Sequence, residues 1–431
     1  MPLGLIVSAA ASGSGKTVVT VGLQRALRRG GWRVAAAKTG PDYIDPVFHA
    51  AATGRASVNI DGFAMAPAML AGLAAAAGAD ADFVVAEGAM GLFDGVASTG
   101  RSGTTADIAR LLGWPVLLVL DAGGAAQTIA ATAHGLATFP GGPRVMGAIA
   151  NRVASERHGR MIAAGFERSG LPLLGLIPKD ERLALPSRHL GLVQAEETDA
   201  LDARIEGTAD VIAEHCDLEA ICGAAAPIAP TSLAPSRIRP PGQRIAVARD
   251  AAFGFLYSHL LDGWRRAGAE IHFFSPLADQ TPSSDCDVCW LPGGYPELHV
   301  GRLASCRQFL EGLRAFAVDR PVHGECGGYM VLGQVIEDAE GVSHAMAGLL
   351  PIATSFARRR LQLGYRRATW RQAMLFAEAG QVSTGHEFHY ATLTESGGEP
   401  LADMADGEGH ALPPAGTRVG HVTGGFFHLI A

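Results

Sequence analysis

A glycine-rich segment near the start of the chain most constrains the fold. Residues 8–17 read Ser-Ala-Ala-Ala-Ser-Gly-Ser-Gly-Lys-Thr, after the apolar run 3–7 and before the small, apolar stretch 18–27. This order predicts a strand, a glycine loop and a helix, where backbone N–H groups and the helix N-terminus attract an anion. A phosphate-binding loop usually begins with glycine, but Ala10 stands there, so the segment is a variant. The alternative is a glycine turn before an ordinary helix.

The residues of such a loop have separate tasks. Gly13 and Gly15, on either side of Ser14, let the backbone approach a phosphate closely. Lys16 reaches the β- and γ-phosphates, and the hydroxyl of Thr17 holds Mg²⁺. The segment therefore predicts a site for ATP with Mg²⁺.

Further apolar runs predict the architecture of the first half of the chain. Residues 33–38, 83–87, 115–121 and 144–150 read as buried strands, and alanine-rich helical segments separate them. Continuous apolar strands that alternate with helices predict a parallel sheet covered on both faces. In such α/β sheets, ligands bind at the carboxyl ends of the strands.

Charged residues stand at those strand ends. A Gly-Pro turn and Pro46 hold the segment 38–46, which carries Lys38, Asp42 and Asp45. Glu87 closes a buried strand and Asp94 follows on a glycine-rich loop. A buried carboxylate is costly unless it meets a metal or a cation, so we expect Glu87 to meet Mg²⁺. The alternative is that these acids cap helices and stabilise turns.

Two later positions also have two interpretations each. Asn151 follows the strand 144–150 and could read the edge of an adenine, although a helix N-cap would look the same in the sequence. Arg188 lies in a loop-like segment and could bind a substrate carboxylate or be a surface charge.

A proline-rich segment divides the chain. Five prolines lie within residues 224–243, which predicts an extended connector. We place one domain at residues 1–223 and a second at residues 244–431. The second contains strand-like runs at 244–248, 271–274 and 288–291, followed by the glycine turn 292–299. Free N–H groups of that turn could form an oxyanion hole.

Cys326 is the candidate nucleophile of the second domain. It lies in the Gly-x-Cys-x-Gly segment 324–328, a nucleophile-elbow pattern with cysteine in place of serine. A following helix is expected to lower the pKa of its thiol. Of six downstream histidines, His428 lies at the end of an aromatic, strand-like stretch. No acid follows it two places later, so the site is either a Cys–His dyad or takes its third member from elsewhere. The competing interpretation is a buried structural cysteine.

Composition limits the partners and the compartment. The formal net charge is −7, which predicts no nucleic-acid partner. The six cysteines are irregularly spaced, and the C-x-x-C at 286–289 reads as a buried strand more than as a zinc site. No run reaches the length of a membrane span, and residues 1–7 lack the basic start of a signal peptide. We expect a cytoplasmic protein without a membrane partner.

Together these motifs resemble the cobyrinic acid a,c-diamide synthase family of cobalamin biosynthesis, including its members that use hydrogenobyrinic acid. The resemblance covers essentially the whole chain. It rests on residues 12–17, 38–46, 87–94, 188–192, 325–328, 385–390 and 427–428.

The resemblance implies an N-terminal ATP-dependent synthetase domain, similar to dethiobiotin synthetase, and a C-terminal class I glutamine amidotransferase domain. It implies Cys326 as nucleophile and His428 as base, an oxyanion hole at Gly294 and Gly327, and Mg²⁺ held by Thr17, Glu87 and Asp42. Lys38 and Asn151 join the ATP-binding residues. The residues implied for substrate binding and phosphoryl transfer are Tyr43, Asp45, Asp94, Arg188, His386, Glu387, His389 and Tyr390.

The implied reaction amidates the a and c side chains of a corrinoid polycarboxylate with ATP and glutamine, in a protein that could be a homodimer. One alternative is a related ligase that amidates nickel sirohydrochlorin or makes cobyric acid. Another is a regulatory ATPase with a non-catalytic amidotransferase-like module, against which the presence of both Cys326 and His428 argues.

Overall fold

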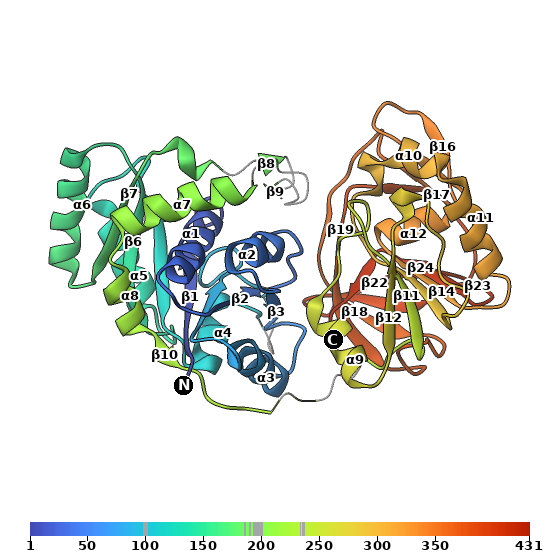
Figure 1. Ribbon diagram of the computed structural model, residues 1–431, viewed down its shortest axis with the longest axis horizontal. Coiled ribbons are helices and arrows are strands. Elements are labelled where there is room, and N and C mark those ends of the chain that lie inside the picture. The colour runs from blue at the N-terminus through green and yellow to red at the C-terminus, as the bar shows by residue number, and fades with distance from the viewer. Residues whose placement is uncertain (98–101, 185–186, 189–190, 193–200, 233, 235–237) are drawn as a thin grey trace. The chain divides into compact units, whose positions relative to one another are not determined.

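The computed structural model divides the chain into two compact units, Met1–Ala234 and Pro235–Ala431 (Figure 1). It describes residues 1–97, 102–184, 187–188, 191–192, 201–232, 234 and 238–431, with only the backbone at 187–188 and 191–192. Within these ranges no helix is long and apolar enough to cross a membrane.

The first unit contains an eight-stranded sheet. Seven strands follow the order β3-β2-β4-β1-β5-β6-β7 and run parallel, and β10 pairs antiparallel with β1. The bounds are β1 Leu3–Ala9, β2 Val34–Thr39, β3 Val58–Ile60, β4 Phe83–Glu87, β5 Val116–Asp121, β6 Val145–Val153, β7 Leu173–Pro178 and β10 Ala226–Pro227. The predicted parallel sheet is confirmed. The start of the predicted extended connector 224–243 pairs with β1 as the short strand β10.

Helices cover both faces of this sheet. Helix α1 packs on α2 and α7, α3 packs on α4, and α5 packs on α6. Their bounds are α1 Lys16–Arg29, α2 Asp45–Thr53, α3 Pro67–Gly78, α4 Thr105–Leu112, α5 Thr128–Thr138, α6 Glu156–Ser169, α7 Leu201–His215 and α8 Leu218–Ala224. A 3-10 turn at Glu181–Leu183 and the short pair β8 (Ser187–Arg188) and β9 (Gly191–Leu192) lie between β7 and α7.

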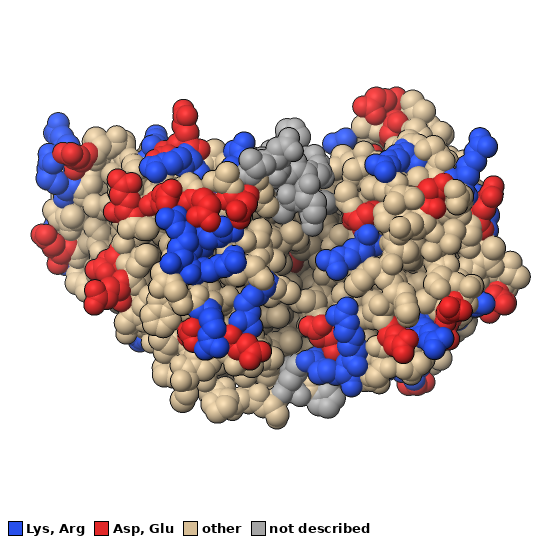
Figure 2. Space-filling view, in the orientation of Figure 1, with Lys and Arg blue, Asp and Glu red and all other residues tan. Residues whose placement is uncertain are grey.

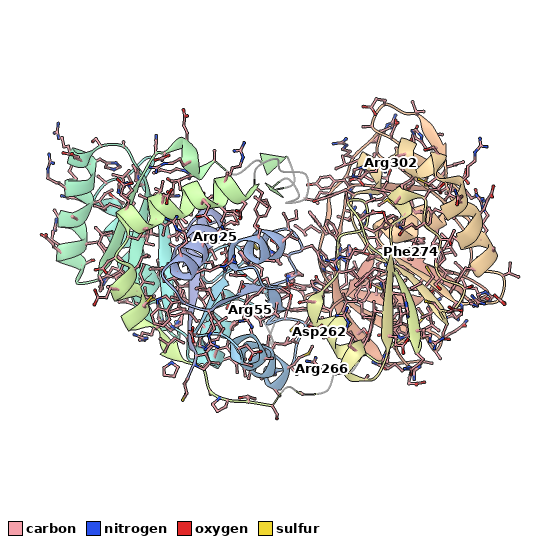
Figure 3. All side chains as sticks on the ribbon, in the orientation of Figure 1. Arg25, Arg55, Asp262, Arg266, Phe274 and Arg302 are labelled. Carbon is pink, nitrogen blue, oxygen red and sulfur yellow. The ribbon has the colours of Figure 1, made fainter. Side chains whose placement is uncertain are left out.

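A buried arginine holds three helices of this unit together. Arg25 of α1, labelled in Figure 3, donates to the carbonyl oxygens of Ala51 and Ala52 at the end of α2. The same guanidinium pairs with Asp202 and Glu206 of α7. The five guanidinium donors and the fixed planar fork of arginine suit such a junction, and the contacts fix the position of α2.

The second unit contains a mixed sheet in the order β12-β11-β13-β14-β24-β23, parallel except for the last pair. The strands are β11 Arg244–Ala248, β12 Glu270–Phe274, β13 Val288–Leu291, β14 Val322–Glu325, β23 Thr417–Val419 and β24 Val422–Gly425. Its helices are α9 Ser258–Arg266, α10 Val300–Ser305, α11 Arg307–Phe316 and α12 Gly327–Leu332, with 3-10 turns at Pro276–Ala278 and Pro296–Leu298.

Two further sheets complete the second unit. One has the order β16-β15-β17-β20 and the other β22-β21-β18-β19-β25. Their bounds are β15 Val335–Glu337, β16 Ser343–Ala345, β17 Ile352–Ser355, β18 Gln362–Trp370, β19 Val382–His389, β20 Thr392–Ser396, β21 Ala402–Asp406, β22 Ala411–Ala415 and β25 Phe427–Leu429. Residues 385–389 of the motif 385–390 form the end of β19.

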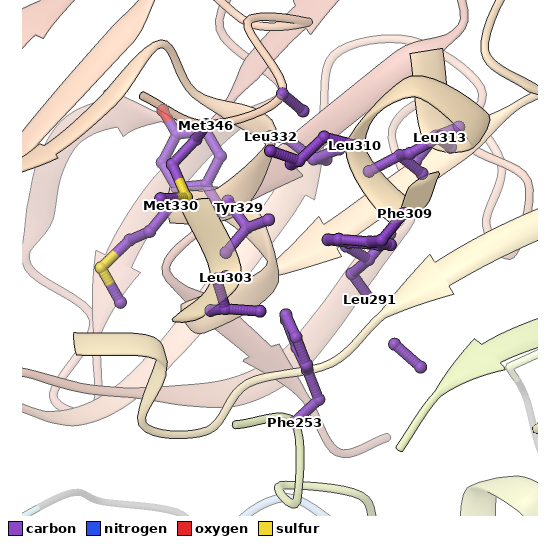
Figure 4. Close-up of a cluster of buried hydrophobic side chains, with 14 of the residues drawn as sticks. Phe253, Leu291, Leu303, Phe309, Leu310, Leu313, Tyr329, Met330, Leu332 and Met346 are labelled. Atoms are coloured by element: carbon purple, nitrogen blue, oxygen red, sulfur yellow. The ribbon is translucent and has the colours of Figure 1, made fainter. Parts of the chain in front are cut away.

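The core of the second unit anchors the turn that carries Cys326. Leu291, Leu303, Phe309 and Met330 belong to one buried apolar cluster (Figure 4). Every residue of α12 is buried, so the short helix after Cys326 is embedded in this cluster. Full burial of each large side chain contributes about 1.5–3 kcal/mol, which holds the nucleophile turn in place.

Charges of both signs are interspersed on the face of the molecule in Figure 2. Arg33 pairs with Asp82 at 2.5 Å and Arg371 with Asp403 at 2.6 Å, with all four side chains in contact with solvent. Exposed pairs of this kind contribute about 0–1 kcal/mol each, so the apolar cores dominate the stability of both units.

Candidate active sites

The phosphate-binding loop has the backbone that its glycines predict. Gly13 and Gly15 have φ values of 80° and 94°, and α1 begins at Lys16 directly after them. A Cβ on Gly15 would overlap the amide nitrogen of Asn151, so only glycine fits there. The oxygen of Ala11 accepts from the Ser14 hydroxyl at 2.9 Å and from Lys16 Nζ at 3.2 Å. Burial lowers the pKa of Lys16, and the carboxylate of Glu87 partly opposes this shift.

Asn151 belongs to this loop through its side chain. Its amide nitrogen donates to the carbonyl oxygen of Ser14 at 3.0 Å, and its oxygen accepts from the backbone of Arg152. The side chain therefore contacts the phosphate-binding loop, and its role at an adenine stays a prediction.

Thr17 and Glu87 come together from elements far apart in the sequence. The Thr17 hydroxyl donates to Glu87 Oε1 at 2.7 Å. Within the described part of the chain, no group of three or more His, Cys, Asp or Glu side chains could hold a metal ion. Mg²⁺ usually takes only one or two protein ligands and keeps waters and phosphate oxygens. A hydroxyl and a carboxylate beside a phosphate-binding loop fit that requirement.

Lys38 lies between two carboxylates. Its Nζ is 2.5 Å from Asp45 Oδ2 and 2.9 Å from Glu87 Oε1. Burial opposes its charge, but the attraction of these two carboxylates outweighs burial and raises the pKa of Lys38. Burial would also raise the pKa of Glu87, yet Lys38 and His49 hold it below its usual range. Burial and the charges of Asp42 and Glu87 raise the pKa of Asp45.

His49 is a member of this cluster that the sequence analysis missed. Its Nε2 lies 2.7 Å from Glu87 Oε2, and both side chains are buried. The available signal was its spacing of four residues from Asp45, which places both on one face of α2.

The other acids of the predicted site make turn contacts. Asp42 Oδ1 accepts from the backbone N–H groups of Ile44 and Asp45 at 2.8 and 3.0 Å, at the start of α2. Asp94 Oδ2 accepts from the N–H of Gly91 at 2.8 Å. These bonds are what the turn-forming alternative predicts.

For two remaining candidates of this unit, the structure gives only the position in the fold. Tyr43 is buried and precedes the start of α2 in the chain. Arg188 lies on β8, and its side chain lies outside the described residues.

Cys326 lies at a strained turn between β14 and α12. Its φ of 46° is in the left-handed region, which is costly for a residue with a side chain and typical of functional turns. Its N–H donates to the oxygen of Gly425 at 2.8 Å, and its Sγ lies 3.6 Å from the oxygen of Phe388. The expectation of a lowered thiol pKa is wrong for this structure. Burial, reinforced by the charge of Glu297, raises the pKa of Cys326, and the N–H of Gly327 opposes that rise only in part.

Gly293 brings His428 and Cys326 to one place. A Cβ on Gly293 would overlap the His428 ring at Cε1 and would lie 3.3 Å from Cys326 Cβ. The backbone of Gly293 therefore fills the space beside both side chains. Burial, with the nearby His386 and His389, lowers the pKa of His428. A neutral imidazole in this position can accept a proton from the thiol.

Gly294 and Gly327 also converge. A Cβ on Gly327 would lie 3.1 Å from the Gly294 nitrogen, and one on Gly294 would overlap the oxygen of Ala252. Both positions are thus closed to side chains, and the oxyanion-hole role of their backbone N–H groups stays a prediction.

The segment 385–390 packs around the thiol site. His386 lies opposite His428 in the β19–β25 pair, and the rings stack at 4.9 Å with an interplanar angle of 21°. His389 stacks on Phe426 at 3.7 Å. Burial lowers the pKa of His386 to about 3 and that of His389 to about 4. His386 thus contacts His428 of the thiol site, and a role for either histidine in substrate binding or phosphoryl transfer stays a prediction.

Glu387 and Tyr390, which neighbour these histidines in the chain, make different contacts. Glu387 forms a salt bridge with Arg366 at 2.8 Å. Tyr390 packs against the apolar cluster that contains Cys326.

Fold and sites together define a two-domain protein with a nucleotide-binding domain before a glutamine amidotransferase domain. The family model for the CobQ/CobB/MinD/ParA nucleotide binding domain matches residues 5–193. The model for the CobB/CobQ-like glutamine amidotransferase domain matches residues 244–431.

Curated relatives extend over both domains. A hydrogenobyrinate a,c-diamide synthase from Mesorhizobium japonicum is 54% identical over 99% of this chain and 98% of its own length. Proteins of the same name from Rhodobacter capsulatus and Agrobacterium fabrum are 56% and 52% identical, over 100% and 99% of this chain and 99% and 98% of their own lengths. The chain therefore belongs to the hydrogenobyrinate a,c-diamide synthase family, and it is a glutamine-dependent, amide-forming ligase.

Proposed function

We propose that this protein amidates the a and c side-chain carboxylates of hydrogenobyrinic or cobyrinic acid in cobalamin biosynthesis, with ATP and glutamine as co-substrates. The observation that carries the proposal is the near full-length identity of 52–56% to relatives of that name, across both domains. We assign the synthetase to residues 1–223 and the glutaminase to residues 244–431.

The synthetase site activates the carboxylate. Oxide is a very poor leaving group, so a carboxylate oxygen first attacks the γ-phosphorus of ATP, which forms an acyl phosphate and releases ADP. The loop N–H groups and Lys16 hold the phosphates, and Lys38 offsets the repulsion between the two anions. Thr17 and Glu87 would hold Mg²⁺, which when bound neutralises phosphate charge. Water must be excluded, or the acyl phosphate hydrolyses.

The glutaminase site supplies ammonia. The sulfur of Cys326 attacks the side-chain amide carbon of glutamine while His428 takes the thiol proton and then gives it to the leaving nitrogen. The N–H groups of Gly294 and Gly327 stabilise the oxyanion. Water then hydrolyses the thioester to glutamate. Because burial raises the pKa of Cys326, proton removal by His428 is needed at the moment of attack.

Ammonia joins the two half-reactions. It attacks the carbonyl carbon of the acyl phosphate, loses a proton, and displaces inorganic phosphate to leave the amide. Two rounds of this sequence, one for each side chain, give the diamide.

Mass spectrometry of the product tests the proposal. The purified protein is incubated with ATP, Mg²⁺ and glutamine and, in separate reactions, hydrogenobyrinic acid, cobyrinic acid and nickel sirohydrochlorin. We expect two amidations of one or both corrinoids. Amidation of nickel sirohydrochlorin alone, or further amidation of an a,c-diamide, would contradict the proposal and indicate that the protein is a related ligase.

A further inference from the structure

The imidazole of His49 forms a hydrogen bond with one carboxylate, that of Glu87. The side chain is fully buried on α2, and Nε2 lies 2.7 Å from Glu87 Oε2. Its other nitrogen, Nδ1, makes no hydrogen bond within the described residues. A carboxylate oxygen accepts hydrogen bonds, so this contact pairs a ring N–H at Nε2 with Oε2 of Glu87.

The two oxygens of Glu87 face different partners. Oε1 accepts from the Thr17 hydroxyl at 2.7 Å and from Lys38 Nζ at 2.9 Å, whereas Oε2 accepts from His49. The last torsion of a glutamate side chain is broad and roughly two-fold, so it sets no orientation by itself. Donors on both oxygens fix the plane of the carboxylate and present Oε1 to the phosphate-binding loop.

The position of His49 does not depend on Glu87. Helix α2 has proline in its first turn, which favours the helix start. Arg25 binds the carbonyl oxygens of Ala51 and Ala52 at its other end. A donor on a helix held at both ends can impose an orientation on the carboxylate it contacts.

We propose that His49 is a positioning residue that orients the carboxylate of Glu87 for Mg²⁺ at the phosphate-binding loop. This inference rests on the proposed function, in which Glu87 is a ligand of that ion. Groups that hydrogen-bond to metal ligands typically change metal affinity or activity 10–100-fold when they are removed. Without the Nε2–H donor, only the contacts to Oε1 remain, and the carboxylate can rotate toward Lys38.

A purely structural role makes a different prediction. If His49 only satisfies a buried carboxylate, its loss lowers the stability of the first unit but leaves the response to Mg²⁺ unchanged in the protein that remains folded. The dependence on Mg²⁺ concentration therefore separates the two roles.

The experiment compares four variants of the full chain with the wild type. His49→Phe keeps a ring but removes the donor, and His49→Gln keeps an N–H group at similar reach. Thr53→Val is the matched control, because it removes a hydrogen bond on the same helix without touching Glu87. Glu87→Gln removes the ligand charge itself. ATP affinity is measured by titration calorimetry with and without Mg²⁺, and ammonium-dependent amidation is measured over a range of Mg²⁺ concentrations.

We expect His49→Phe to require about 10–100-fold more Mg²⁺ and to bind ATP alone like the wild type. His49→Gln recovers most of this loss, and Thr53→Val matches the wild type. A wild-type Mg²⁺ response in His49→Phe together with an impaired Glu87→Gln overturns the positioning role and leaves the proposed function intact. A wild-type response in Glu87→Gln removes Glu87 as a ligand. If His49→Phe does not fold, His49→Asn, whose shorter amide does not reach Glu87, takes its place against His49→Gln.

Discussion

The carboxyl group of Glu325 accepts a hydrogen bond from the backbone N–H of Leu429, with 3.1 Å between Oε1 and the nitrogen. Glu325 directly precedes Cys326, and Leu429 directly follows His428. One buried side chain thus joins the strand that ends at the nucleophile, β14, to the strand that carries the base, β25. No acid stands two places after His428, and this contact ties the residue before the nucleophile to the residue after the base.

Replacement of Glu325 tests that link. Glu325→Gln keeps an oxygen that accepts from Leu429, whereas Glu325→Ala leaves a buried N–H without a partner, at a cost of about 1–3 kcal/mol. We expect Glu325→Ala to lower kcat for glutamine hydrolysis with a smaller change in KM, and Glu325→Gln to remain close to the wild type. Steady-state kinetics of both variants, with thermal unfolding as the check on folding, measures this. Equal activity of Glu325→Ala and the wild type contradicts the link.

The stability of the protein should also depend on pH through Glu325. Burial raises the pKa of this carboxyl from 4.5 to about 8. The folded state therefore binds the proton more tightly, so the contribution of Glu325 to stability is complete below pH 4.5 and is lost as pH rises through about 8. Relative to the wild type, Glu325→Gln should gain stability on the order of a few kcal/mol across that interval. Urea unfolding of both proteins at several pH values measures the difference, and a constant difference would refute the assignment.

The thiol of Cys326 should serve only the use of glutamine. We expect Cys326→Ala to abolish glutamine-dependent amidation and to retain amidation with ammonium, because carboxylate activation belongs to the other site. Cys286→Ala is the matched control, since Cys286 is also buried but lies at the end of the loop before β13. Both activities are assayed with each variant. Loss of both in a folded Cys326→Ala protein contradicts the division into two sites.

Gly293 should be intolerant of a side chain although it carries no reactive group. In Gly293→Ala the new Cβ would overlap the ring of His428. We expect glutamine hydrolysis to fall by roughly 10²–10⁴, the range for loss of a general base, while ammonium-dependent amidation persists. Gly301→Ala, where the nearest atom to a new Cβ is 3.9 Å away, is the control. Wild-type glutaminase activity in Gly293→Ala would separate His428 from the reaction.

The sequence predicted the elements that depend on local pattern. The strand, loop and helix around Gly15, the parallel sheet of the first unit and the elbow at Cys326 follow from residues close together in the chain. Contacts between distant residues could not be found in this way. His49 meets Glu87 from 38 residues away, and Glu325 meets Leu429 from 104 residues away. Local pattern also gave the wrong sign for the thiol pKa of Cys326, because burial is set by the whole unit.

The contacts of Lys38 indicate a specific role for Asp45. Lys38 Nζ contacts both Asp45 and Glu87, so one cation lies between two carboxyl groups beside the phosphate-binding loop. Transfer of a phosphoryl group to a carboxylate brings further negative charge there, and the position of Lys38 decides how much of it is offset.

We expect Asp45→Asn to stop amidation with either nitrogen source, because the neutral amide no longer holds Lys38 between the two carboxylates. Glutamine hydrolysis at Cys326 should persist, since Cys326 lies in the other domain. The measurement is paired, with product formed from ammonium and glutamate released from glutamine. Asp82→Asn, which changes an exposed partner of Arg33, is the control and should leave both unchanged. Wild-type amidation with ammonium in Asp45→Asn would contradict this role and indicate that Asp45 only stabilises a turn.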